Sequence, residues 1–258
     1  LSESSWKATK WKKQSKTKYD KIMSMPEFFK DGHGNTEIIE KNHFLIQTVR
    51  IPKNEEPSLR KVCQIALNIG CCFGQLIGKG PIIIGGDTRV SYDCIISSVI
   101  SGLLSVGSDV THIGQVTTPT VQQAIKKHNA AGGMVITASH NPIQWNGIKL
   151  MNDTGSFLSQ SQYDQFISFY DTKEFTLKSW DQLGTLSYDN QAIESHIDLI
   201  LSKIDTTKLS QSNLNVLIDA NNGSGAIADP LLLDKLGVNY TILNKEPNGH
   251  FQHDPEPL

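Results

Sequence analysis

Net charge, long apolar runs and cysteine are all scarce in this sequence, and each shortage excludes a class of protein. The 24 lysines and arginines nearly balance the 26 aspartates and glutamates, which leaves a net charge of −2. Nucleic-acid binders usually carry a strong basic excess. The most apolar stretch, residues 65–77, is interrupted by glycines and polar residues and is shorter than the roughly 18 residues of a membrane helix. We therefore expect a globular protein with neither a nucleic-acid nor a membrane partner.

The four cysteines follow no metal-binding or disulfide spacing. Cys63, Cys71 and Cys72 fall within one predicted helix, and Cys94 falls in the next. A zinc knuckle needs paired C-x-x-C spacing, which is not present. The N-terminus also shows no signal-peptide pattern. We expect reduced, mostly buried thiols and a cytoplasmic location. The sequence carries no signature of an oligomeric state.

Residues 1–43 differ in composition from the rest and are interpreted as a basic N-terminal extension. Seven lysines lie in the first 21 residues, with Trp6 and Trp11 among them. Such a segment could contact an anionic surface or carry a targeting signal. A solvated tail is the favoured interpretation. Because the first residue is Leu1, we expect a fragment or a processed product.

From residue 44 onward, strand and helix patterns alternate, which is typical of an α/β domain with a sheet between helices. We assign residues 44–208 to this first domain and expect a mixed sheet. Glycines and prolines separate the elements. The expected strands are 44–51, 81–85, 109–113, 133–137 and 147–151, and the expected helices are 57–77, 91–105, 118–128, 159–171 and 190–204.

A second α/β unit begins after a polar linker near residues 205–212. Residues 214–220 and 238–243 are predicted strands, and residues 226–236 between them are a predicted helix. One strand-helix-strand unit cannot bury its own sheet. We therefore assign residues 209–258 to the first part of a second, similar domain that is incomplete.

The strongest chemical signal is the loop at residues 137–142, TASHNP, which follows a buried strand. Ligands bind at the carboxyl ends of such strands. The following turn at residues 146–147 would return Lys149 toward Ser139, so that a hydroxyl, the His140 imidazole and an ammonium could converge on a phosphate. Two alternatives remain. A serine hydrolase is disfavoured because the G-x-S-x-G elbow is missing and because extended neighbours such as Ser139 and His140 point apart. A purely structural turn would also use these residue types.

Several further segments, in order, make this chain resemble the phosphohexomutase superfamily. That family includes phosphoglucosamine mutases, phosphomannomutases and phosphoglucomutases. The loop TASHNP with WNGIKL at residues 145–150 is similar to its phosphoserine loop. The other similar segments are 85–91 (GGDTRVS), 117–120 (TTPT), 219–225 (DANNGSG) and 247–251 (PNGHF) with 253–257 (HDPEP). In the segment GGDTRVS, Asp87 and Arg89 either brace a loop by an ion pair or contact substrate.

The resemblance implies an isomerase, a mutase that moves a phosphoryl group between the 6- and 1-positions of a hexose phosphate. Ser139 would be the phosphorylated serine, and a hexose 1,6-bisphosphate would be the intermediate and activator. Mg²⁺ would bind the seryl phosphate on Ser139 and neutralise charge during transfer. Lys149 and His140 would supply positive charge or proton transfer. Arg50 would be the family's N-terminal arginine facing the phosphoserine.

Two departures from the family pattern qualify this expectation. Residues 47–51, QTVRI, replace the Ser/Asp-Gly-Ile-Arg-Gly pattern around Arg50, and residues 31–34, DGHG, offer an alternative anchor without an arginine. The family's Asp-x-Asp-x-Asp metal loop and later domains are also missing, so we expect these residues alone to be almost inactive. Glucosamine phosphate is the favoured substrate, with mannose or glucose phosphate as alternatives. A non-catalytic binding or regulatory protein with part of the mutase fold is the rival.

Overall fold

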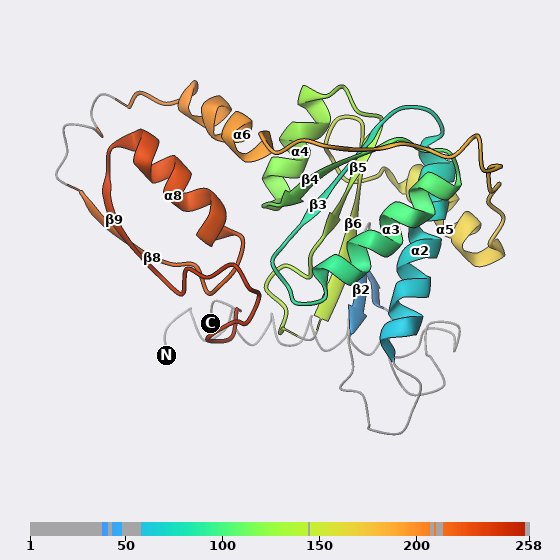
Figure 1. The fold of residues 1–258 in the computed structure, drawn as a ribbon, viewed down its shortest axis with the longest axis horizontal. Coiled ribbons are helices and arrows are strands. Elements are labelled where there is room, and N and C mark those ends of the chain that lie inside the picture. Colours follow the sequence, from blue (N-terminus) through green and yellow to red (C-terminus); the bar gives the residue numbers. More distant parts are fainter. Residues whose placement is uncertain are drawn as a thin grey trace, which may run out of the picture.

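The computed structural model describes residues 38–40, 43–47, 58–143, 145–206, 209 and 214–255, with side chains described from Val62 onward. The described strands form a seven-stranded mixed sheet and a separate two-stranded sheet. Figure 1 shows the larger sheet with its helices at the right and the unit of β8, α8 and β9 at the left. None of the described helices is long and apolar enough to cross a bilayer.

The larger sheet has the strand order β1-β2-β6-β5-β3-β4-β7. Parallel pairing joins β5, β3, β4 and β7, and antiparallel pairing joins β1, β2, β6 and β5. The expected mixed sheet is therefore present. The strands are β1 (Ile38–Glu40), β2 (His43–Gln47), β3 (Ile82–Gly86), β4 (Val110–Gln115), β5 (Gly132–Ile136), β6 (Trp145–Asn152) and β7 (Leu186–Tyr188). Because β1 pairs with β2, the sheet begins inside the segment that composition assigned to an N-terminal extension.

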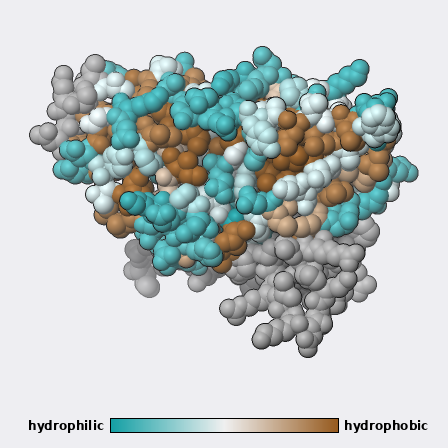
Figure 2. All heavy atoms as spheres, viewed as in Figure 1, coloured by the Kyte–Doolittle hydropathy of each residue, from teal (hydrophilic) through white to brown (hydrophobic). Residues whose placement is uncertain are grey.

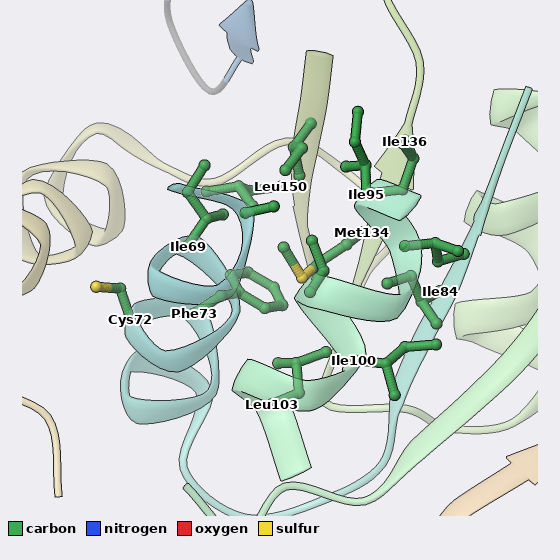
Figure 3. Close-up of a cluster of buried hydrophobic side chains, with 14 of the residues drawn as sticks. Ile69, Cys72, Phe73, Ile84, Ile95, Ile100, Leu103, Met134, Ile136 and Leu150 are labelled. Atoms are coloured by element: carbon green, nitrogen blue, oxygen red, sulfur yellow. The ribbon is translucent and has the colours of Figure 1, made fainter. Parts of the chain in front are cut away.

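Helices cover both faces of this sheet. They are α2 (Ser58–Ile77), α3 (Tyr92–Ser105), α4 (Thr118–Lys127), α5 (Gln160–Thr172) and α6 (Ala192–Leu201). On one face, residues of α2, α3 and α5 pack on Ile84, Met134 and Leu150. Figure 3 shows Phe73 of α2 and Leu103 of α3 in this cluster. On the other face, α4 and α6 pack against Ile83 and Val135. The result is a three-layer α/β/α arrangement. Successive side chains of each buried strand point to opposite faces of the sheet and pack against the helices there.

The second unit contains β8 (Asn215–Asp219), α8 (Gly225–Leu236) and β9 (Asn239–Leu243), with the two strands parallel. Burial alternates along both strands, and Leu217 and Leu243 are 67% and 46% exposed. Figure 2 shows hydrophobic residues at the surface of this unit, at the left of the view. Helix α6 lies between the two units and contacts both α4 and α8.

Candidate active site

The candidate site is the segment from Thr137 to Ile143, hereafter the serine loop, at the carboxyl end of β5. Strand β5 is buried throughout its length, and its two neighbours β3 and β6 hold it from both sides. Ser139 and His140 are exposed, although Thr137 and Ala138 just before them are buried. The sheet therefore delivers a serine hydroxyl to the surface at the edge where parallel strands place ligands.

Ser139 adopts a left-handed conformation, with φ of 56°. This region is unfavourable for residues with a Cβ and is found where surrounding contacts enforce it, often at functional sites. The Ser139 amide donates to Thr137 Oγ1 at 3.0 Å. The expectation of an extended chain here was wrong, because the left-handed turn brings Ser139 Oγ within 3.4 Å of His140 Nδ1 instead of sending the two side chains apart.

Arg89 holds the serine loop through its main chain. Its Nη1 donates to the carbonyl oxygens of Pro142 at 2.8 Å and of Trp145 at 2.9 Å. Its Nη2 donates to the carbonyl oxygens of Ser139 at 3.1 Å and of Asn141 at 2.8 Å. Together with Nε, which donates to Asp87, these contacts match the five donors of a guanidinium. Arg89 thus braces the loop, which was one of the two roles that the sequence left open.

Asp87 holds both Arg89 and the serine loop, and the two residues are hereafter called the Asp87–Arg89 support. Its Oδ2 accepts from Arg89 Nε at 3.1 Å and from Thr137 Oγ1 at 2.6 Å. Arg89 is 2% exposed, and burial lowers the pKa of its guanidinium, an effect that the charge of Asp87 opposes. Gly86 is needed just before Asp87, because a Cβ there would overlap the carbonyl oxygen of Ile136. The strand-end segment that follows β3 and the serine loop therefore form one hydrogen-bonded structure.

Lys149 lies on β6 directly opposite Val135 of β5, which precedes Ser139 by four residues. Directly paired residues share a face of the sheet, so Lys149 lies on the same face as Thr137. Burial lowers the pKa of the Lys149 ammonium, and the nearby charge of Asp87 opposes this shift. The structure thus brings Ser139 and His140 together and places Lys149 deeper, on the side of Asp87. Arg50 lies outside the described residues.

The second unit contacts the other side of this support. The Thr88 hydroxyl donates to the carbonyl oxygen of Asn222 at 2.9 Å, and the guanidinium carbon of Arg89 lies 5.0 Å from the centre of the Phe251 ring. The amide of Gly249 also donates to the carbonyl oxygen of Asn222, at 3.2 Å. The turn that begins α8 is therefore a junction with the first unit. Sequence patterns did not identify Phe251 as a site residue, because no local periodicity reports a contact so distant along the chain.

The described residues contain no group of three or more His, Cys, Asp or Glu side chains arranged to hold a metal ion. Asp87, the carboxylate next to the serine loop, is engaged by Arg89 and Thr137. Magnesium prefers several oxygen ligands in octahedral geometry. The side chains of the described residues therefore do not form a magnesium site by themselves.

Residues 53–177 match the family model described as "Phosphoglucomutase/phosphomannomutase, alpha/beta/alpha domain I". A phosphoglucomutase/phosphomannomutase of Thermococcus kodakarensis is 36% identical over 200 residues, covering 75% of this chain and 44% of the relative. A probable phosphoglucosamine mutase of Methanococcoides burtonii is 37% identical over 194 residues, covering 75% and 43%. This chain thus spans less than half the length of these relatives.

Solved structures share the fold. A putative phosphomannomutase from Thermus thermophilus superimposes with a TM-score of 0.71 at 22% identity, covering 86% of this chain and 49% of that one. At this identity the likeness concerns the fold alone. The matched segment includes α2, the Asp87–Arg89 support, the serine loop and Lys149. Residues 53–177 accordingly belong to the phosphohexomutase family, as its first α/β/α domain.

Proposed function

We propose that this chain is the serine-bearing part of a phosphohexose mutase, in which Ser139 carries the phosphoryl group that is exchanged with a hexose phosphate. The observation that carries the proposal is an exposed serine in a left-handed conformation on a loop whose carbonyl groups are held by one buried arginine. A phosphoryl carrier must be fixed in position and yet open to substrate. The serine loop meets both requirements.

The reaction would shift a phosphoryl group between the 6- and 1-positions of the sugar. The phosphoserine would give its phosphoryl group to the free hydroxyl, and a 1,6-bisphosphate would form. After reorientation of this intermediate, the second phosphate would return to Ser139. His140, 3.4 Å from Ser139 Oγ, would take or return a proton at that oxygen. An imidazole nitrogen can accept or donate a proton, so this role suits histidine.

Lys149 would contribute positive charge near the transferring group. Phosphoryl transfer depends mainly on positioning and on neutralising the charge of the phosphoryl oxygens. The lowered pKa of Lys149 also makes its proton easier to release than that of an exposed lysine. We propose glucosamine phosphate as the substrate, since probable phosphoglucosamine mutases recur among the relatives. Mannose and glucose phosphates are the alternatives.

Mg²⁺ is proposed as the cofactor and would supply charge neutralisation on the seryl phosphate. In the described part of the chain, Ser139 would offer the one ligand that we can name, through its phosphate. The contributions of Ser139, His140 and Lys149 to positioning and proton transfer do not depend on where the remaining ligands come from.

Phosphoryl loading of Ser139 tests the proposal. The chain would be incubated with a hexose 1,6-bisphosphate and magnesium, and intact-mass spectrometry with peptide mapping would follow the product. Because these residues alone are expected to be almost inactive, we expect slow and partial addition of one phosphate, located on Ser139 and lost in Ser139→Ala. Ser156→Ala, a change at another serine that follows a strand, is the matched control and should leave loading intact. A chain that never acquires phosphate on Ser139, or acquires it elsewhere, would support the rival non-catalytic role.

A further inference from the structure

Helices α2 and α3 pack against each other at backbone contact. A Cβ on Gly70 would overlap the carbonyl oxygen of Val99, and a Cβ on Gly102 would overlap the carbonyl oxygen of Leu67. The helices run in the same direction, because Cys63 meets Cys94 toward their N-terminal ends and Cys71 meets Ser105 further along. This close approach fixes which side chains face each other along the helix pair.

Cys63 and Cys94 lie opposite each other where this helix pair begins. Their Sγ atoms are 3.2 Å apart, and both residues are free cysteines of intermediate exposure. A disulfide requires an S–S distance of about 2.05 Å, so a small adjustment of the two side chains would suffice. The spacing of 31 residues in sequence is unlike any metal or redox motif, and only the helix packing brings the two thiols together.

We propose that Cys63 and Cys94 form a dithiol modification site, which a low-molecular-weight disulfide oxidises to a covalent bond between α2 and α3. The inference is independent of the phosphoryl transfer proposed for Ser139. It concerns a different part of the fold, on helices that pack against the sheet.

The chemistry is two successive thiol–disulfide exchanges. The thiolate of one cysteine attacks the small disulfide, forms a mixed disulfide and releases one small thiolate. The second cysteine then attacks the protein sulfur of the mixed disulfide, forms the Cys63–Cys94 bond and releases the other small thiolate. Two protein thiols lose two protons and two electrons, and the small disulfide is reduced to two thiols.

The other two cysteines differ in a way that makes the reaction selective. Cys71 and Cys72 are completely buried. Burial raises the pKa of both thiols, that of Cys72 to about 12. The pKa of Cys94 is also raised, but first by its hydrogen bond with Cys63 and only then by burial, and Cys94 remains partly exposed. Because the thiolate is the reactive form, buried thiols of this kind are inert. Modification is therefore expected at the Cys63–Cys94 pair alone.

The bond would close a chain segment that includes β3 and the Asp87–Arg89 support of the serine loop. Cys94 lies in the first turn of α3, three residues after Ser91, whose hydroxyl donates to Asn146 at 2.6 Å. A cross-link that closes such a segment restricts the unfolded chain more than the folded one. The oxidised protein should therefore unfold at a higher urea concentration than the reduced protein.

The experiment uses the full chain, first reduced and freed of reductant, then treated with oxidised glutathione. Glutathione is removed, and the remaining thiols are alkylated in denaturant so that Cys71 and Cys72 also react. The product is analysed by intact mass and by non-reducing peptide mapping. We expect the chain before alkylation to be lighter than the reduced chain by two hydrogens, two of the four cysteines to escape alkylation, and one cross-linked peptide to join Cys63 to Cys94. Dithiothreitol should restore four alkylated cysteines.

Variants separate this outcome from others. Cys63→Ser and Cys94→Ser should each stop at a single glutathione adduct on the remaining partner, whereas Cys71→Ala should form the cross-link as the parent does. The mapping of the unaltered chain does not depend on how these variants fold. A glutathione adduct that persists on both Cys63 and Cys94, a bond involving Cys71 or Cys72, or four thiols that all remain reactive would overturn the proposal.

Discussion

Arg89 donates from Nη2 to the carbonyl oxygen of Ser139 at 3.1 Å, so the main chain of the candidate phosphoryl carrier is held by a side chain fifty residues earlier in the sequence. The same guanidinium holds three further carbonyl groups of Asn141, Pro142 and Trp145. The residue that sets the shape of the loop therefore need not touch the substrate itself. This separation makes the two roles distinguishable by mutation.

Replacing Arg89 with lysine should lower the free energy of unfolding by about 2–4 kcal/mol. An ammonium has three donors and cannot reach Asp87 and four carbonyl groups together, and each buried acceptor left unpaired costs about 1–3 kcal/mol. Urea unfolding followed by circular dichroism measures the change. Lys203→Ala, on an exposed residue, is the control and should lie within about 0.5 kcal/mol of the parent. If Arg89→Lys left the free energy of unfolding unchanged, the bracing role of Arg89 would be contradicted.

Phe251→Ala should lower the free energy of unfolding by about 1–2 kcal/mol, because the ring, which belongs to the second unit, covers the buried guanidinium of Arg89. The effect should depend on Arg89. A double-mutant cycle with Arg89→Met measures the coupling between the two side chains. If Phe251→Ala costs the same in both backgrounds, the ring packs there without interacting with the cation.

Gly249→Ala should destabilise the chain more than Gly237→Ala does. Both glycines have positive φ, 70° and 66°, so each substitution carries a conformational cost of about 1–2 kcal/mol. A Cβ on Gly249 would in addition overlap the carbonyl oxygen of Thr88, whereas none of the described atoms lies near a Cβ on Gly237. Urea midpoints of the two variants, measured side by side, give the difference. Equal midpoints would mean that the contact between Gly249 and Thr88 contributes nothing.

Lys149→Met should raise the free energy of unfolding near neutral pH by about 0.5–1 kcal/mol and slow the loading of Ser139. Because burial lowers the pKa of folded Lys149, the unfolded chain binds more protons at this site between the folded pKa and the ordinary value of 10.5. The stability of the parent therefore rises with pH across that window. The advantage of Lys149→Met should shrink as the pH approaches 10.5.

Unfolding curves of parent and variant at several pH values test this dependence. Lys126→Met, on the exposed end of α4, serves as the control for loss of a lysine charge. An advantage that stays constant or grows with pH would show that burial of the Lys149 charge is not its source.

Local sequence patterns determined most of the elements of the fold. The buried run in β5, the glycine and proline boundaries of α2 and α4, and the helical period of α6 all predicted elements that the structure contains. These signals are local, since side-chain periodicity and turn chemistry act within a few residues. Strand β7 was missed, because its three residues are all exposed and show neither burial nor alternation.

Only the tertiary structure decided which distant residues meet. From the sequence, Arg89 could either contact substrate or brace a loop. Because β3 pairs with β5, Arg89 lies beside the serine loop and donates hydrogen bonds to its carbonyl groups, so it braces the loop. The left-handed turn at Ser139 and the cover by Phe251 arise from the same non-local contacts. Cys63 and Cys94 likewise meet only because Gly70 and Gly102 let two helices touch. Strand order and helix packing bring these partners together, and no short-range pattern in the chain encodes either.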